Sequence, residues 1–368
     1  MLILVKGLGL GGVERLLSQS LGYLDRDRFD YEACYLTPWK DDVVPDFERA
    51  GIEITCLEVE SDIAPSAFTK VRRFIRDGGY DIIHTHSPLP SSIARLVKPR
   101  AQVRGFVHTE HSLPGSRNLV TRLANRVTYP LCDVVIPVSQ VVSDSVAGSW
   151  PAPKEIRLIH GGIDDVAMRT ATAEAVAETR RSVGIPDGHR VVGNVAHLRE
   201  QKGLEVWLEA AAEVARAGPA TSFVLVGREK VPGYQETLES RAKRLGIEEL
   251  VHFVGFQPDP YPYLGMFDVF LMSSEFEGFP IALVEAMAMG TPVVSTDVGG
   301  VREAVGDTAL LTESGDSSGL AGHVIELLRD EARRTNLADR ARTRARSEFT
   351  VESMVAKVEE VYEDLLRA

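Results

Sequence analysis

Cysteine is scarce and scattered in this sequence. Its 368 residues include three, Cys34, Cys56 and Cys132, and no two of them form a C-x-x-C pair. Structural zinc sites and disulfide frameworks depend on recognisable cysteine spacings, so the sequence supports neither. We expect all three to be buried, reduced thiols.

Long apolar runs are also missing. No stretch approaches the roughly 18 apolar residues that a membrane-spanning helix requires. Residues 1–5 lack the charged start, apolar centre and small-residue cleavage site of a secretory signal. We therefore expect a cytoplasmic protein, and peripheral contact with the inner face of the membrane remains open.

Positive charge is in deficit overall but is locally concentrated. The net charge of −12 argues against broad nucleic-acid binding, and we expect no nucleic-acid partner. Residues 65–126 nevertheless contain eleven Lys or Arg against three acids. One face of the first half is therefore expected to be basic, and this region is the candidate for contact with an anionic membrane.

The sequence does contain a regular alternation of strand-like and helix-like segments. At roughly 100 to 200 residues per domain, this length fits two domains. In the first half, short apolar runs alternate with segments of helical spacing, which is typical of a parallel sheet covered on both faces. The expected strands are 1–5, 31–36, 52–57, 81–85, 103–109, 133–138 and 156–159, and the expected helices include 67–76 and 116–129.

A polar, alanine-rich stretch interrupts the alternation before it restarts near Val191. The second half is expected to hold strands 191–195, 223–226, 251–254, 269–272 and 292–295 and helices 204–217, 234–245 and 351–366. The predicted fold class is α/β, with two Rossmann-like parallel-sheet domains. We expect a first domain at 1–165, a linker at 166–188, a second domain at 189–349, and a helix at 350–368 that packs back on the first domain.

Glycines follow the first strand, where Gly7, Gly9 and Gly12 spell G-x-G-x-x-G. In a dinucleotide-binding fold, an acid at the end of the second strand binds the adenosine ribose. Here that strand ends without an acid, and Glu32 lies at its beginning, so NAD(P) binding is disfavoured. A plain tight turn remains open, as does a turn whose backbone approaches a phosphate or a sugar.

Two carboxylates flank a predicted helix in the second half. Pro280 suits the first helical position, which places Glu277 in the preceding loop and Glu285 more than one turn inside the helix. Carboxylates hydrogen-bond sugar hydroxyls, and the N–H groups near Ile281 and Ala282 would suit a phosphate. A nucleotide sugar has this layout. The alternative is that Glu277 caps the helix and Glu285 is a solvated surface acid.

Other polar turns in the second half supply a cation, Lys202, and a further glycine turn at Gly299-Gly300. With these motifs the chain resembles the family 4 glycosyltransferases of the GT-B fold, which are retaining enzymes with a nucleotide-sugar donor. The matching pieces are Gly11-Gly12-Val13-Glu14, Asp81-Ile82-Ile83-His84-Thr85-His86, His108-Thr109-Glu110-His111, Val138-Ser139, Ile159-His160-Gly161-Gly162-Ile163-Asp164, Lys202-Gly203, Glu277-Gly278-Phe279 through Glu285-Ala286, and Gly299-Gly300 with Glu303.

This resemblance covers almost the whole chain. It implies two domains that face each other across a cleft, with Glu285 on the nucleotide ribose, Lys202 on the diphosphate and the Gly11-Gly12 turn over the donor phosphates. It also implies that His111 and Glu277 are the catalytic residues at the transferred sugar. The donor-binding residues expected on this basis are Gly11, Gly12, His197, Arg199, Lys202, Gly278, Phe279, Pro280, Ile281 and Glu285.

The sequence departs from the family pattern in two places. The family usually has an arginine on the diphosphate where this chain has His197. Neutral histidine is a poorer phosphate ligand than arginine, so either His197 is protonated in the complex or Arg199 substitutes for it. The asparagine usual before the Gly-Ile-Asp piece is Gly161 or Gly162 here, and we assign no role to that segment.

Metal and cofactor sites have weaker support. His84, His86, His108, Glu110 and His111 follow two neighbouring strands and would suit zinc, but a polar rim that binds sugar hydroxyls is the favoured interpretation. The D-x-D sequence 25–27 lies between a helix and a strand, at the edge away from ligand sites in open sheets, and we interpret it as a solvated turn. We expect no cofactor and no metal.

The expected reaction is transfer of a sugar, from a UDP-sugar rather than a GDP-sugar, to a sugar, lipid-linked or small-molecule acceptor. Such transfer serves polysaccharide, glycolipid or glycoconjugate biosynthesis. A nucleotide-sugar epimerase would instead consume the donor without an acceptor, and a non-catalytic binding protein would bind it without turnover.

The predicted helix 116–129 bears on the acceptor. Leu119, Val120, Leu123 and Val127 lie on one side of it, beside Arg117, Arg122 and Arg126. An interfacial helix on anionic lipid would have this pattern. A helix packed in the core, with a solvated basic edge, is the commoner arrangement and the favoured one.

Overall fold

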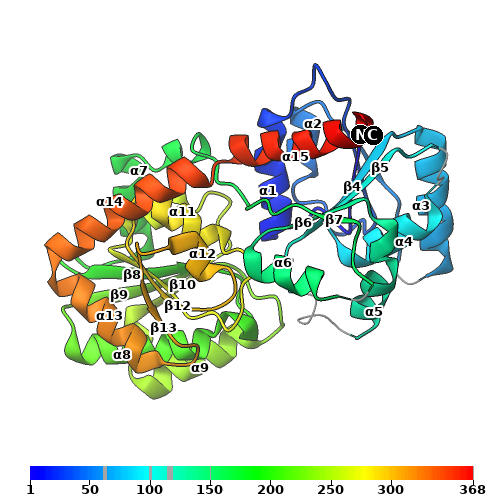
Figure 1. Ribbon diagram of the computed structural model, residues 1–368. Coiled ribbons are helices and arrows are strands. Elements are labelled where there is room, and N and C mark those ends of the chain that lie inside the picture. The colour runs from blue at the N-terminus through cyan, green and yellow to red at the C-terminus, as the bar shows by residue number, and fades with distance from the viewer. Residues whose placement is uncertain (61–63, 99–101, 114–118, 150, 368) are drawn as a thin grey trace. The chain divides into compact units, whose positions relative to one another are not determined.

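The computed structural model divides into two compact units (Figure 1). One unit is Met1–Gly162 together with Val351–Ala368, and the other is Ile163–Thr350. The structure describes residues 1–60, 64–98, 102–113, 119–149 and 151–367. Because the chain passes from the first unit into the second and then returns, the C-terminal helix belongs with the N-terminal half.

A parallel sheet forms the centre of the first unit, with strand order β3-β2-β1-β4-β5-β6-β7. The order reverses direction between β1 and β4, and ligands in such sheets bind beyond the carboxyl ends of the strands at this switch point. The strands are β1 (Leu2–Val5), β2 (Glu32–Tyr35), β3 (Glu53–Cys56), β4 (Ile82–Thr85), β5 (Gly105–Glu110), β6 (Val134–Pro137) and β7 (Glu155–Ile156).

Helices cover both faces of this sheet. Leu17, Phe47 and Val361, from the first, second and last helices, pack on strand residues such as Ile3 and Val107. On the other face α3, α4 and α5 lie side by side. The helices of this unit are α1 (Gly12–Ser20), α2 (Val44–Arg49), α3 (Pro65–Gly78), α4 (Pro88–Val97), α5 (Leu119–Thr128), α6 (Gln140–Ala147) and α15 (Val351–Arg367).

The second unit repeats the architecture, with strand order β10-β9-β8-β11-β12-β13 and parallel pairing throughout. Its strands are β8 (Arg190–Val195), β9 (Thr221–Val226), β10 (Val251–Gly255), β11 (Val269–Met272), β12 (Val293–Thr296) and β13 (Leu310–Thr312). Its helices are α7 (Ala173–Val183), α8 (Leu204–Ala217), α9 (Tyr234–Leu245), α10 (Tyr261–Met266), α11 (Ile281–Met289), α12 (Val301–Val305), α13 (Ser317–Arg329) and α14 (Glu331–Glu348).

The core of the second unit lies between its sheet and the layer of α8, α9 and α13. Trp207 of α8 is fully buried there, and its indole N–H donates to the Leu271 carbonyl oxygen at 2.9 Å. On the other face α11 packs between α10 and α14. The carboxyl ends of the central strands and the start of α11 are therefore held between two layers of packed helices.

The predicted α/β class with two Rossmann-like parallel sheets is confirmed. Three expected elements, 204–217, 234–245 and 269–272, have the bounds of α8, α9 and β11. The stretch 166–188, expected as a linker, instead contains α7, which belongs to the second unit and packs on α10. Thr172 caps α7, because its hydroxyl oxygen accepts from the Ala175 amide at 3.2 Å.

The three cysteines are free thiols, with Cys34 and Cys132 buried and Cys56 half-buried. None of the helices in the described parts of the chain has the length and apolar character to cross a membrane.

Candidate functional site

Lys202 and Glu277 meet at the carboxyl ends of β8 and β11 in the second unit. The Lys202 ammonium donates to Glu277 Oε1 at 2.6 Å, and the Ser274 hydroxyl donates to the same oxygen at 2.6 Å. The Lys202 and Glu277 side chains are 18% and 9% exposed. The two charges therefore form a largely desolvated pair whose partners compensate each other.

Two glycine turns hold the Glu277 loop in place. Gly203, between Lys202 and α8, has φ +58, and a Cβ there would lie 2.1 Å from the Ser273 carbonyl oxygen. Gly299, before α12, has φ +53, and its Cβ would lie 1.7 Å from the Glu277 carbonyl oxygen. Only glycine combines a left-handed conformation with so close a backbone approach.

Glu285 lies in the second turn of α11 and is 3% exposed. Its Oε1 accepts from the Tyr261 hydroxyl at 3.1 Å. A solvated surface position is therefore wrong for this acid. The carboxylate is therefore held in a fixed position, from which a carboxylate oxygen can accept a hydrogen bond from a bound hydroxyl.

The turn before α11 differs in detail from the expectation. Pro280 precedes the helix, and the Ile281 amide, expected to be open to a phosphate, donates to the Phe279 carbonyl oxygen at 3.1 Å. A short turn at Phe279–Ile281 thus uses this donor internally. Phe279 is buried against the edge of the Phe349 ring, with centroids 5.3 Å apart, and with Gly278 it completes the connection from Glu277.

A cation-rich loop surrounds His197 after β8. Burial, followed by the positive charges of Lys230, Arg199, Lys202 and Arg228, lowers the pKa of His197 to about 4. His197 is therefore neutral at pH 7 in the free protein. Arg228 and Lys230 are brought there because the backbone after β9 pairs with the backbone after β8, with Leu198 N–H donating to the Arg228 carbonyl at 3.0 Å.

Arg199 has a buried Nε with no hydrogen-bond partner in the described part of the chain. A buried donor of a charged group without a partner is costly, so it points to a ligand that supplies an acceptor. An anion such as a phosphate fits this donor and the cations around it. Both His197 and Arg199 therefore stay candidates for the diphosphate.

In the first unit, the glycine turn after β1 is tied to the loop after β2. The Leu8 amide donates to the Lys40 carbonyl at 2.7 Å, and a Cβ on Gly7 would lie 2.7 Å from the Lys40 side chain. The absence of a side chain at Gly7 is thus explained by internal packing. Gly11 precedes α1, and a Cβ on Gly12, its first residue, would meet nothing within 4 Å.

Imidazole rings form a ladder along the carboxyl ends of β4 and β5. His84 Nδ1 lies 2.5 Å from the Tyr362 hydroxyl, and its Nε2 lies 2.7 Å from Thr109 Oγ1. His86 lies against His84, with ring centroids 4.2 Å apart, and its Nδ1 is 3.2 Å from His111 Nε2. Burial lowers the pKa of His84 to about 3 and that of His86 well below 6.5, so both rings are neutral.

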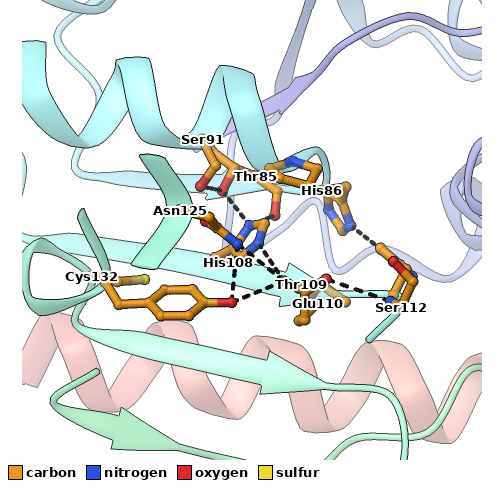
Figure 2. A network of polar contacts seen from close by, with 12 residues as sticks. Thr85, His86, Ser91, His108, Thr109, Glu110, Ser112, Asn125 and Cys132 are labelled. Atoms are coloured by element: carbon orange, nitrogen blue, oxygen red, sulfur yellow. Dashed lines mark hydrogen bonds and ion pairs between the residues drawn. The ribbon is translucent and has the colours of Figure 1, made fainter. Parts of the chain in front are cut away.

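The expected set of zinc-like ligands is divided by the sheet. Successive residues of a strand point to opposite faces, so His108 and Glu110 lie on the face opposite His84 and His86. His108 Nδ1 lies 3.0 Å from Thr85 Oγ1 on that face, as Figure 2 shows. Within the described residues, no group of three or more His, Cys, Asp or Glu is arranged to hold a metal ion.

The D-x-D sequence at 25–27 forms a turn before β2. Asp25 Oδ1 accepts from the amides of Asp27 and Arg28, each at 3.2 Å. Its oxygen thus serves the local turn, as the sequence interpretation supposed.

Glu110 is fully buried at the end of β5, next to His111. Its Oε2 accepts from the Tyr129 hydroxyl at 3.0 Å and from Asn125 Nδ2 at 3.2 Å (Figure 2). Arg95 is 2% exposed and donates to Asn125 Oδ1 at 2.7 Å. This network fixes the strand end that carries His111 and joins it to α4 and α5.

A pocket of the first unit adjoins the ladder, between the sheet, α1 and α15. Its polar lining includes His84, His86, His111 and Tyr362, and most of the other lining residues are apolar. Tyr31, also in the lining, donates to Glu359 Oε1 at 2.6 Å. Because several of these polar groups bond one another, the pocket offers chiefly hydrocarbon surface.

From the sequence, no role was assigned to several of these residues. Ser274, Tyr261, Arg228 and Lys230 in the second unit and Tyr362 in the first had no assigned part. For Arg228 and Lys230, the position directly after β9, the neighbour of β8, was a usable signal. Tyr362 comes from a helix distant in sequence and carried no such signal.

Two family models match the chain. Residues 10–166 match Glycosyltransferase Family 4, and residues 175–344 match Glycosyl transferases group 1. The N-acetyl-alpha-D-glucosaminyl L-malate synthase of Bacillus anthracis is 30% identical over 295 residues, which are 78% of this chain and 75% of the relative. The D-inositol 3-phosphate glycosyltransferase of Corynebacterium urealyticum is 30% identical over 324 residues, 82% of this chain and 76% of the relative.

Solved structures share the fold over nearly the whole length. Anabaena Alr3699/HepE, solved in complex with UDP and glucose, has a TM-score of 0.85 at 23% identity and covers 98% of this chain and 99% of its own. WaaG, a glycosyltransferase involved in lipopolysaccharide biosynthesis, has a TM-score of 0.74 at 16% identity, with coverage of 98% and 99%.

Proposed function

This chain belongs to the family 4 glycosyltransferases and has their GT-B fold, and on that premise we propose that it is a retaining enzyme that transfers a sugar from a UDP-sugar to a hydroxyl acceptor. The observation that carries the proposal is the polar edge of the second unit. There the Lys202–Glu277 pair and the buried Arg199 Nε lie on loops beside a helix that carries the buried Glu285. Cations for a diphosphate and carboxylates for hydroxyls match a nucleotide sugar.

UDP is the preferred nucleotide in this proposal. Alr3699/HepE has been solved with UDP-glucose, and its fold matches this chain with a TM-score of 0.84. In our assignment Glu285 binds the ribose, while Lys202 binds the diphosphate together with His197 or Arg199. The Lys202 ammonium has three donors, so it can keep Glu277 with one and bind phosphate oxygens with the others.

The proposed reaction needs no covalent sugar intermediate. The bond from the anomeric carbon to the UDP oxygen breaks, and the acceptor oxygen attacks from the face that the UDP leaves. The acceptor proton passes to the departing phosphate oxygen. Lys202 stabilises the negative charge that develops on UDP, which is the kind of contribution that lowers such barriers most. The family resemblance assigns Glu277 and His111 to the transferred sugar and Gly11-Gly12 to the donor phosphates.

The relatives suggest the acceptors to try first. Their names specify L-malate and D-inositol 3-phosphate, each of which has a free hydroxyl. We place the reaction within glycoconjugate, glycolipid or polysaccharide biosynthesis.

The test is a panel of UDP- and GDP-sugars incubated with these acceptors, with release of nucleoside diphosphate as the readout, with and without EDTA. We expect release from a UDP-sugar that needs an acceptor, survives EDTA and gives a product with the donor's anomeric configuration. Inverted product, or activity lost in EDTA and restored by zinc or manganese, would contradict the proposal. Donor conversion without acceptor would indicate an epimerase, and binding without turnover a non-catalytic protein.

A further inference from the structure

The structure overturns the expectation that α5 packs in the core by its apolar side. Leu119, Val120, Leu123 and Val127 are 66%, 65%, 56% and 61% exposed. We propose that α5 docks the protein on an anionic lipid surface, with these four side chains in the acyl-chain boundary and Arg122 and Arg126 among the headgroups. This inference goes beyond sugar transfer and does not depend on it. The expected start of the helix, including Arg117, lies outside the described residues.

The polarity of α5 is the reverse of that of an ordinary surface helix. At 100° per residue, the four exposed apolar positions fall within an arc of roughly 100°. The buried positions on the opposite side are polar, namely Asn125 and Thr128. Apolar side chains face water and polar ones face the protein, so burial of the apolar side must come from something outside this unit's core.

The inner face of α5 is fixed in this orientation by specific bonds. Arg95 donates to Asn125 Oδ1 at 2.7 Å and to Thr128 Oγ1 at 3.1 Å. Asn125 in turn donates to the buried Glu110, and Figure 2 labels this pair. Rotating the helix to bury its leucines would leave these groups without partners inside the protein. Because an unpaired buried charge is costly, the exposed stripe is a stable feature of the fold.

The positive charge of α5 favours an anionic partner. The helix contains no acid, and its exposed arginines, Arg122 and Arg126, border the apolar stripe. From residue 82 to residue 132 the sequence has one acid, Glu110, and its side chain is fully buried, whereas Arg122 and Arg126 are exposed. In a chain of net charge −12, an acid-free helix with two exposed arginines is complementary to anionic headgroups.

The neighbouring helix also exposes an apolar side chain. Leu96, near the end of α4, is 58% exposed, and α4 packs beside α5. A two-fold contact between copies through α5 would bring its arginines close to their own equivalents, with no acid on the helix to pair with them. A lipid surface meets the apolar stripe and the basic edge at once and fits better than a second copy.

The test is sedimentation of the full-length protein with vesicles of phosphatidylglycerol and phosphatidylcholine in equal parts, against pure phosphatidylcholine. The double variant Leu119→Ser/Leu123→Ser should lower the partition coefficient at least about tenfold, and Arg122→Gln/Arg126→Gln should lower it on anionic vesicles and reduce its salt dependence. The matched control is Val166→Ser/Val231→Ser, at positions in the second unit that are 58% and 50% exposed. It should bind as the wild type does.

Equal sedimentation of the wild type and Leu119→Ser/Leu123→Ser would overturn the proposal, as would a wild type that stays in the supernatant. Self-association that this variant abolishes, without vesicle binding, would assign the face to a second copy and overturn it too. Thermal unfolding of each variant by circular dichroism identifies any that fails to fold, and the arginine variant, which leaves the stripe intact, is then the deciding comparison. No step requires a sugar donor, so failure here is distinguishable from failure of the proposed transfer reaction.

Discussion

The Lys202 ammonium and the Glu277 carboxylate are 2.6 Å apart and largely shielded from water, with Ser274 on the same carboxylate oxygen. Removal of either partner leaves the other's charge uncompensated in a desolvated place. Neutral replacements of similar shape therefore report on catalysis more cleanly than truncation does. Glu277→Gln keeps one oxygen for Ser274 while it removes the charge.

Glu277 and Glu285 should separate kinetically. Glu277→Gln should lower kcat by about 100-fold, because the charge near the transferred sugar acts mainly in the transition state. Glu285→Gln should instead raise the donor KM about tenfold or more, because the hydrogen bond that the ribose hydroxyl donates would no longer go to a charged acceptor. Donor-saturation kinetics measure both. Tyr261→Phe, which removes the hydroxyl that contacts Glu285, is the control, and equal small effects of both glutamate changes would return the acids to structural roles.

UDP affinity should depend on pH through His197. The pKa of its imidazole is about 4 in the free protein because of burial and four neighbouring cations. Negative phosphates raise that pKa in the complex, so binding takes up a proton. Affinity should then rise as pH falls from the pKa of the complex toward 4. Calorimetric titration of UDP in two buffers of different ionisation enthalpy measures the proton uptake.

The matched variants for this site are His197→Arg and Arg199→Ala. Arginine stays charged, so His197→Arg should flatten the pH dependence and preserve binding at alkaline pH. A wild-type affinity independent of pH, together with a severe defect in Arg199→Ala, would transfer the diphosphate role to Arg199.

Gly299→Ala should lower turnover, because the added methyl group displaces the Glu277 loop in addition to straining the backbone. A Cβ there would lie 1.7 Å from the Glu277 carbonyl oxygen, so the Glu277 loop must move. Gly315→Ala is the matched control, because Gly315 also has positive φ, +86, and open space around it. Both variants should lose about 1 kcal/mol or more from left-handed strain, measured by urea unfolding. Only Gly299→Ala should also lower kcat, and equal kcat in the two would contradict the assignment.

The histidine ladder should make the protein sensitive to acid. Burial lowers the pKa of His84 to about 3, whereas an unfolded histidine titrates near 6.5. The unfolded state therefore binds more protons between these values, so this contribution to stability is full above about pH 6.5 and is lost as pH falls toward 3. Urea unfolding at pH 7, 5.5 and 4.5 should show a smaller decline for His84→Gln than for wild type. His323→Gln, which removes an imidazole from α13, controls for the loss of a histidine elsewhere, and parallel declines in all three proteins would refute the prediction.

Local sequence patterns were sufficient for the frame of the fold. The spacing of apolar residues located α8, α9 and β11, because an element that buries one face has apolar residues at regular intervals. The same logic failed for α5. Its apolar stripe was expected in the core, but a network that involves Arg95 and Glu110, distant in sequence, holds its polar side inward.

Site details depended on contacts that no local pattern encodes. Lys202 and Glu277 lie close together because β8 and β11 are neighbours in the sheet. From the sequence, only the family motifs placed both residues at the donor. The division of His108 and Glu110 from His84 and His86 could have been read from strand alternation, since these residues occupy opposite parities of paired strands. The internal use of the Ile281 amide required the turn geometry itself, because one rotated peptide decides whether that donor is available.

The chain returns to the first unit at Val351, so the first unit is built from two separate segments and the second from one continuous segment. A fragment cut after Gly162 would contain every strand of the first sheet but not α15, which supplies Val361 and Tyr362 to the core and the hydroxyl that contacts His84. The face that this helix covers would expose apolar side chains to water. His84 Nδ1 and the Tyr31 hydroxyl would lose the partners that α15 supplies. During synthesis the first unit therefore cannot complete its core until α15 has been made, whereas the second unit, whose chain is continuous, is complete before α15.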